Sequence, residues 1–241
     1  MLTFKNNLYI IDKTMYLKST IFDFLPIEKV FTIRYNYIII IERNNGGLAV
    51  KLLEDRILRD GKIYEGDVLK VDSFVNHMID VAFINELGKE LHRLYGGLGV
   101  NKILTIEASG IGIACLAAQH FNVPVVFAKK SKTSNISPDL HTAKVDSYTH
   151  GKTYDIVVSK EFLTKNDRVL IIDDFLAKGS ALKGLIEVSR SAGAEIVGAG
   201  VVIEKAYQGG GDYIRQEMGV RVEALAKIKS MSLDGGIEFC D

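Results

Sequence analysis

Two adjacent carboxylates, Asp173 and Asp174, follow an apolar run and precede a turn of small residues. The apolar run, Val169 to Ile172, predicts a short buried strand, and the residues after the turn predict a helix. Free N–H groups at a helix N-terminus can bind a phosphate, and carboxylates nearby can accept hydrogen bonds from hydroxyls. This order of residues therefore predicts a site for a phosphorylated sugar, with the two acids at the carboxyl end of the strand.

The turn after the acids supplies donors for a phosphate from five consecutive residues: Ala177, Lys178, Gly179, Ser180 and Ala181. We expect their backbone N–H groups to hold the phosphate, and the Ser180 hydroxyl to add a further donor. The turn is not a Walker P-loop, because its Lys-Gly-Ser order lacks the preceding spaced glycine, and it is not a G-x-G-x-x-G turn. Neither an ATPase nor a dinucleotide-dependent dehydrogenase is indicated.

Strands that alternate with helices must position this site. The sequence predicts strands at 101–106, 123–128, 154–159, 169–172, 196–203 and 220–228, and helices at 76–95, 113–121, 181–193 and 213–218. This alternation predicts an α/β fold with a doubly wound, mostly parallel sheet and flanking helices. Ligands bind at the carboxyl edge of such a sheet, where the turns at 107–112 and 173–181 and the segment after Ile203 meet. Residues 129–151 lack periodicity, which predicts a long loop that acts as a lid.

The composition narrows the class of protein. Lys+Arg and Asp+Glu are both 30 in 241 residues, and this balance argues against a general nucleic-acid-binding protein. No apolar run reaches the roughly 18 to 20 residues of a membrane span, so we expect no membrane association. Cys115 and Cys240 are far apart and form no C-x-x-C motif, which favours a reducing cytoplasm.

An apolar run, two acids and a small-residue turn together resemble the signature of the type I phosphoribosyltransferases, which bind phosphoribosyl pyrophosphate (PRPP). From Val50 to the C-terminus the chain further resembles the xanthine-specific purine branch of that family. The similar stretches are 69–80 (LKVDSFVNHMID), 107–111 (EASGI), 123–128 (VPVVFA) and 202–205 (VIEK).

The resemblance implies a fold with a small hood over the sheet edge, and a pentosyltransferase activity in purine salvage. The expected reaction transfers the 5-phosphoribosyl group of PRPP to xanthine and gives xanthosine 5′-monophosphate (XMP) and pyrophosphate. Asp173 and Asp174 are then expected to hold the ribose hydroxyls, directly or through Mg²⁺ that arrives with the substrate. The resemblance also implies a cytoplasmic homodimer.

The residues that match the purine contacts of the family are Leu69, Asn76 and Lys205. Leu69 can pack on the ring, Asn76 can donate and accept at its polar edge, and Lys205 can donate to a 6-oxo oxygen. Asn76 also suits a helix N-cap, and the two roles can coexist. The alternative for Lys205 is a surface lysine after a strand.

The turn after the strand at 101–106 contains Glu107, Ser109 and Gly110, where small residues let backbone approach pyrophosphate. Related adenine enzymes carry an arginine in this turn, whereas this chain has Ser109. The resemblance therefore implies that Mg²⁺ and two lid residues, Lys129 and Lys130, compensate the charge. The alternative for the two lysines is a solvated basic loop.

Residues 1–49 lie outside the resemblance and contain one strongly strand-like run, Tyr35 to Ile41. We expect this segment to be dispensable for the domain at 50–241. Two explanations stay open: an internal start at Val50, so that residues 1–49 are absent from the native protein, or a genuine extension that packs the apolar run.

A regulator that keeps the PRPP fold as an effector sensor and binds DNA is the alternative function. Such proteins carry a winged-helix segment before the fold, and a helix-turn-helix needs two short amphipathic helices. Residues 1–49 show no such pair and no basic surplus. The enzyme is therefore the preferred hypothesis.

Overall fold

The computed structural model describes residues 48–130, 139–147 and 152–240, together with four strands earlier in the chain. The chain divides into two compact units, Met1–Leu48 and Ala49–Asp241. In the first unit the described elements are β1 (Thr3–Lys5), β2 (Leu8–Asp12), β3 (Lys29–Arg34) and β4 (Tyr37–Glu42). They form an antiparallel sheet in the order β1-β2-β4-β3. The strand-like run seen in the sequence thus falls largely on β4, and three further strands accompany it.

The second unit is built on a six-stranded sheet in the order β14-β13-β12-β11-β7-β8. Its strands are β7 (Lys102–Ile106), β8 (Val125–Ala128), β11 (Arg168–Leu176), β12 (Glu195–Lys205), β13 (Val222–Ser232) and β14 (Gly236–Phe239). All neighbours pair in parallel except β14, which is antiparallel to β13. The predicted mostly parallel, doubly wound sheet is confirmed.

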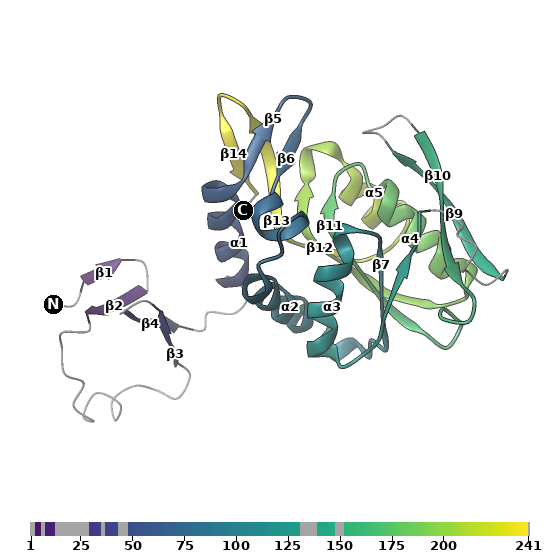
Figure 1. Ribbon diagram of the computed structural model, residues 1–241, viewed down its shortest axis with the longest axis horizontal. Coiled ribbons are helices and arrows are strands. Elements are labelled where there is room, and N and C mark those ends of the chain that lie inside the picture. The colour runs from purple at the N-terminus through teal and green to yellow at the C-terminus, as the bar shows by residue number, and fades with distance from the viewer. Residues whose placement is uncertain are drawn as a thin grey trace. The chain divides into compact units, whose positions relative to one another are not determined.

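Helices cover both faces of this sheet (Figure 1). One face packs against α1 (Leu48–Asp60), α2 (Val81–Tyr95) and α3 (Ser109–Phe121), and the other against α4 (Ser180–Ser191) and α5 (Gly210–Gln216). On β11, Leu170 and Ile172 enter the first core, whereas Val169 and Ile171 enter the second. Successive side chains of a strand point to opposite faces, so a continuous apolar run must be covered on both faces of the sheet, as it is here.

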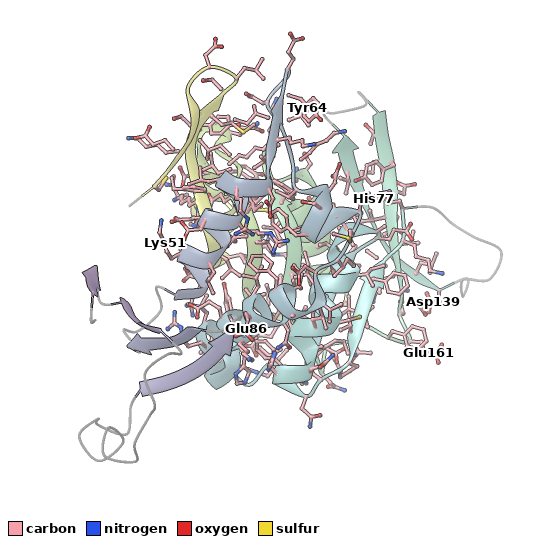
Figure 2. All side chains as sticks on the ribbon, turned by 60° about the vertical axis from the view of Figure 1, so that its left-hand side comes forward. Lys51, Tyr64, His77, Glu86, Asp139 and Glu161 are labelled. Carbon is pink, nitrogen blue, oxygen red and sulfur yellow. The ribbon has the colours of Figure 1, made fainter. Side chains whose placement is uncertain are left out.

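Two antiparallel hairpins extend from the sheet. The first, β5 (Lys62–Tyr64) with β6 (Val68–Lys70), leads into a short π-helix at Asp72–Asn76, and together they form the small hood. Figure 2 shows Tyr64 near the tip of this hairpin. The second, β9 (Leu140–Ser147) with β10 (Lys152–Ser159), packs on α4, and Figure 2 shows Asp139 and Glu161 close together at its open end.

Three predicted boundaries are wrong. β11 continues to Leu176, so Asp173 and Asp174 lie inside the strand and not at its end, because pairing with β12 persists as far as Leu176 opposite Glu204. The helix expected at 76–95 begins at Val81, after the π-helix has ended at Asn76. The loop expected at 129–151 contains β9, which pairs with β10 and buries Ala143 and Val145 in the core that α4 shares. The remainder of that loop, 131–138 and 148–151, lies outside the described residues, and with it the expectation of a lid.

Candidate functional site

A cavity of about 600 Å³ opens between the hood and the carboxyl edge of the sheet. Leu69 and Asn76 line it from the hood, Lys205 from the end of β12, and the turn Ala177–Ala181 from the opposite part of the wall. These eight residues are the predicted purine contacts and the predicted phosphate turn. The fold therefore brings together residues that lie up to 136 positions apart in the sequence.

The predicted phosphate turn, residues 177–181, leads directly into α4, which begins at Ser180. Gly179 has φ of 84°, a left-handed conformation that favours glycine. Its carbonyl accepts the first helical hydrogen bond from the Lys183 N–H, at 2.8 Å. The N–H groups that precede this bond have no acceptor within the helix, and the residues that carry them line the cavity.

Asp173 and Asp174 are both buried, and the Asp174 N–H donates to Asp173 Oδ1 at 3.0 Å. Burial raises the pKa of the Asp173 carboxyl well above its usual range, and the neighbouring Asp174 carboxylate raises it further. The cationic Lys130 opposes this shift of the Asp173 pKa. The two acids do not themselves line the cavity, although Phe175 and Leu176, which follow on β11, do.

The turn at 107–110 lies against Asp173. A Cβ placed on Gly110 would overlap the Thr105 hydroxyl oxygen and stand 3.2 Å from Asp173 Oδ1, so a side chain at this position would displace Thr105 and crowd the acid. The Glu107 carboxylate accepts a hydrogen bond from the backbone N–H of Lys130. Lys130 Nζ lies 5.7 Å from the ring centre of Tyr154, which lines the cavity. Burial and the charge of Asp173 both raise the pKa of Tyr154. Glu107, Gly110 and Lys130 thus gather beside the acid pair.

Two predicted pyrophosphate residues are placed differently. Lys129 forms backbone hydrogen bonds with Val157 and lines a separate cavity of about 700 Å³ along β8 and β10. It does not join the first cavity. Ser109 is the first residue of α3 and is half-buried, and the described contacts do not link it to Asp173 or Lys130.

Lys205 is the last residue of β12 and is buried, which answers the alternative of a surface lysine. Its ammonium donates to the backbone carbonyl of Asp67 in the hood turn and lies 5.9 Å from the ring centre of Phe175. Burial lowers the pKa of Lys205, and the charge of Asp67 partly offsets this shift. A cationic donor is therefore held beside an aromatic ring in a partly desolvated pocket.

Asn76 does not cap a helix. The N-cap of α2 is Asp80, whose Oδ1 accepts from the Phe83 N–H at 3.1 Å. The amide of Asn76 at the cavity wall is thus not used for capping, and its proposed role toward a ligand remains a prediction.

Sequence reasoning missed nine lining residues: Gly66, Asp67, Val68, Val145, Tyr154, Phe175, Leu176, Leu182 and Gln208. Gly66 and Asp67 have φ of 77° and 60°, and the Glu-Gly-Asp sequence does indicate a turn there. Nothing local, however, indicates that this turn reaches Lys205, 138 positions later. Phe175 could have been found from its place between the acids and the phosphate turn.

Within the described residues, no group of three or more His, Cys, Asp or Glu side chains could hold a metal ion. Among the helices described, none combines the length and apolar character that crossing a membrane requires.

The family described as the phosphoribosyl transferase domain matches residues 70–222. The xanthine phosphoribosyltransferase of Lachnoclostridium phytofermentans is 57% identical over 187 residues, which cover 78% of this chain and 96% of that protein. The xanthine phosphoribosyltransferase of Ruminiclostridium cellulolyticum is 51% identical over 192 residues, or 80% of this chain and all of that protein.

Solved structures with the same fold include two adenine phosphoribosyltransferases. The enzyme from Trypanosoma brucei in complex with AMP, pyrophosphate and ribose-5-phosphate has a TM-score of 0.63 at 18% identity, and covers 76% of this chain and 83% of its own. The enzyme from Giardia lamblia complexed with 9-deazaadenine has a TM-score of 0.62 at 21% identity, and the match covers 73% of this chain and 97% of that chain. At these identities the likeness concerns the fold alone.

Proposed function

Because this chain belongs to the phosphoribosyltransferase family, and within it to the branch of the xanthine phosphoribosyltransferases, we propose that it transfers the 5-phosphoribosyl group of PRPP to xanthine. The products are XMP and pyrophosphate, and the reaction returns a free purine to the nucleotide pool. One observation of the structure carries the proposal: a single cavity is lined both by residues 177–181 and by Leu69, Asn76 and Lys205.

The phosphate end of PRPP fits the N-terminus of α4. Backbone N–H groups of residues 177–181 and the Ser180 hydroxyl hold the 5′-phosphate, while the helix dipole favours its charge. Asp173 and Asp174 lie one to two residues before the lining residues of β11 and hold the ribose hydroxyls. This assignment orients C1′ of the ribose toward the purine pocket.

The reaction forms a bond from a xanthine ring nitrogen to C1′ while the bond from C1′ to pyrophosphate breaks, and the ring nitrogen loses its proton. Positive charge develops on the ribose ring in the transition state, so the chain acts chiefly by positioning the reactants and stabilising charge. Glu107, Gly110 and Lys130 lie beside Asp173, where the departing pyrophosphate is expected. Small residues let the backbone approach the pyrophosphate oxygens, and Lys130 adds positive charge.

Mg²⁺ suits this site as a companion of the substrate. Burial and the neighbouring Asp174 carboxylate raise the pKa of Asp173, so a nearby cation would stabilise the charged form of the pair. Mg²⁺ prefers few protein ligands together with water and phosphate oxygens. Asp173 and Asp174 are the residues that would hold it through the ribose hydroxyls or waters. When bound, the ion supplies neutralisation of the pyrophosphate charge.

The purine pocket selects the base by its donors. Lys205 can donate only, so it matches the 6-oxo oxygen of xanthine, and Asn76 can serve the polar edge as donor or acceptor. Leu69 and Phe175 offer apolar surface to the ring. Adenine presents an amino group to Lys205, and an unmatched buried polar group costs about 1–3 kcal/mol, or roughly a 5- to 150-fold loss of kcat/KM.

We also propose a cytoplasmic homodimer without nucleic-acid partners. The thiols of Cys115 and Cys240 are both free, which suits a reducing compartment. The elements described within residues 1–47 are strands, so this described part contains no helix pair of the kind that a DNA-binding regulator carries. Light scattering after size-exclusion chromatography tests the dimer, and a monomeric mass at micromolar concentration would count against it.

A purine panel tests the proposed function. Purified protein is given PRPP, Mg²⁺ and one of xanthine, guanine, hypoxanthine or adenine, and nucleotide formation is followed by liquid chromatography. We expect the highest kcat/KM for xanthine and the lowest for adenine. Use of adenine as efficiently as xanthine would refute the pocket assignment, and absence of any nucleotide product would refute the function itself.

A further inference from the structure

Three consecutive glycines begin α5: Gly209 is its N-cap, and Gly210 and Gly211 are its first two residues. They do not line the cavity, and they belong to neither of the sequence motifs described above, the acid pair and the phosphate turn. Gly209 has φ of 74°, so the segment turns sharply after the short 3₁₀ helix Ala206–Gln208. The next two glycines are buried and make close contacts of different kinds.

Gly210 packs backbone to backbone against the phosphate turn. A Cβ on Gly210 would overlap the carbonyl oxygen of Ala177 and stand 2.5 Å from the Lys178 carbonyl carbon and 2.6 Å from the Gly179 nitrogen. The contact is reciprocal, because a Cβ on Gly179 would lie 3.3 Å from the Gly210 carbonyl oxygen. No flexible side chain separates the two segments, so neither backbone can shift without the other.

Gly211 packs against the residue that precedes Lys205. A Cβ on Gly211 would overlap the carboxylate of Glu204 and stand 2.6 Å from Arg215 Nη1. Glu204 is fully buried and forms a bidentate pair with Arg215 of α5, at 3.0 and 2.6 Å. Arg215 also donates to the Val222 carbonyl at 3.2 Å, which ties α5 to β13. The carboxylate has no freedom to move aside, since both of its oxygens are engaged.

We propose that Gly210 and Gly211 position the phosphate turn relative to Lys205, and so set the spacing between the 5′-phosphate and purine ends of the bound nucleotide. Gly210 fixes the turn at Ala177–Gly179, and Gly211 fixes the Glu204–Lys205 end of β12, within one short segment. This inference rests on the proposed function for the identity of the two ligand ends. It assigns positioning residues on α5, outside the cavity wall.

Gly210→Ala tests the contact with the phosphate turn. Its new Cβ must move the two backbones apart by roughly 1 Å to reach ordinary van der Waals contact. A displacement of this size at a positioning element weakens binding or turnover by about tenfold or more. We expect the Kd for PRPP with Mg²⁺, measured by calorimetry, and the KM for PRPP to rise by about this factor, while the KM for xanthine changes by less than about twofold.

Gly97→Ala is the matched control, because Gly97 is exposed, has no positive φ, and its Cβ would meet nothing within 4 Å. Its kinetics should equal those of the wild type. A folded Gly210→Ala variant that binds PRPP as the wild type does would overturn the proposal, and so would equal losses for PRPP and xanthine, which indicate general distortion.

A milder pair keeps the test decisive if Gly210→Ala does not fold. Ile214 of α5 is fully buried, and a Cβ on Gly179 would lie 3.5 Å from its Cγ1. Ile214→Val removes the Cδ1 methyl group that this Cγ1 carries, so it loosens the packing of α5 beside the phosphate turn without deleting Cγ1 itself. Ile84→Val on α2 removes the same group from the other core. We expect weaker PRPP binding only for Ile214→Val, and equal PRPP affinity in the two variants would overturn the proposal. Calorimetry needs no turnover, so a wild type that binds PRPP but makes no XMP would refute the proposed function and leave this inference standing.

Discussion

Lys205→Met should separate recognition of the purine from stability of the fold. The substitution keeps an unbranched apolar chain beside Phe175 but removes the ammonium that donates to the Asp67 carbonyl and, in our assignment, to the 6-oxo oxygen. A hydrogen bond to a charged group contributes about 1.5–3 kcal/mol, which corresponds to a loss of roughly 10- to 150-fold in kcat/KM for xanthine. The affinity for PRPP should stay unchanged, because the phosphate turn is untouched.

The stability of the same variant should not fall. Burial lowers the pKa of Lys205 in the folded state, so the charged form costs the folded protein stability. This cost is fully present below the folded-state pKa and disappears as the pH rises above the unfolded value of about 10.4. At pH 7, methionine removes the buried charge, and the Tm should therefore equal or exceed that of the wild type.

Steady-state kinetics with xanthine varied at saturating PRPP and Mg²⁺, together with thermal melts, measure both effects. Lys183→Met is the matched control, because Lys183 is an exposed lysine on α4 whose Nζ lies 3.9 Å from Glu187. It should keep the wild-type kcat/KM. If Lys205→Met also kept the wild-type kcat/KM, Lys205 would not contact the base; if its Tm fell sharply, the lysine would be structural.

Three further predictions address the acids, the metal ion and the N-terminal segment. The double variant Asp173→Asn, Asp174→Asn should lose most turnover, whereas its Tm at pH 7 should match or exceed that of the wild type. The pKa of Asp173 is raised in the folded state, so the stability of the wild type falls as the pH rises from the unfolded-state pKa to the folded-state pKa. Thermal melts across this pH range should show the fall only in the wild type. Removal of Mg²⁺ by EDTA should abolish XMP formation, and added Mg²⁺ should restore it; full activity in EDTA would contradict the assignment. A chain that begins at Val50 should keep the wild-type kcat/KM and the Tm of the second unit, because it retains the buried Leu53 and Ile57 of α1. If truncation abolished activity and mass spectrometry found the full-length chain in the native protein, residues 1–49 would be a genuine functional extension.

The sheet could be predicted from the sequence because its strands carry a strong local signal. β11 and β12 are nearly continuous apolar runs, and each is followed by a helical stripe, so their parallel pairing follows from general rules of connection. Their ends could not be placed in the same way. The polar Asp173 and Asp174 interrupt the apolar run, yet the backbone pairs past them, because strand pairing depends on the neighbouring strand and not on the residue's polarity.

The site residues likewise fall into two groups, those that a local sequence pattern indicates and those that only the fold brings together. Ala177–Ala181 could be proposed as a phosphate turn because its residues are contiguous, and the pair Asp173 and Asp174 ends only two residues before them. Asp67, by contrast, contacts Lys205 only because the hood folds over the sheet edge, and no local pattern encodes that approach. Lys129 and Lys130 were predicted to share a role because they are neighbours in the sequence, but Lys129 lines the cavity along β8 and β10 whereas the Lys130 ammonium lies over the Tyr154 ring, as alternation along the chain allows.

A crystal structure of the protein with XMP tests the central claim most directly. The account predicts the 5′-phosphate within hydrogen-bond distance, about 3 Å, of the backbone N–H groups at 177–181, the ribose hydroxyls beside Asp173 and Asp174, and Lys205 Nζ moved from the Asp67 carbonyl to the 6-oxo oxygen. A nucleotide bound with its phosphate at the 107–110 turn, or with its base away from Lys205, would contradict it.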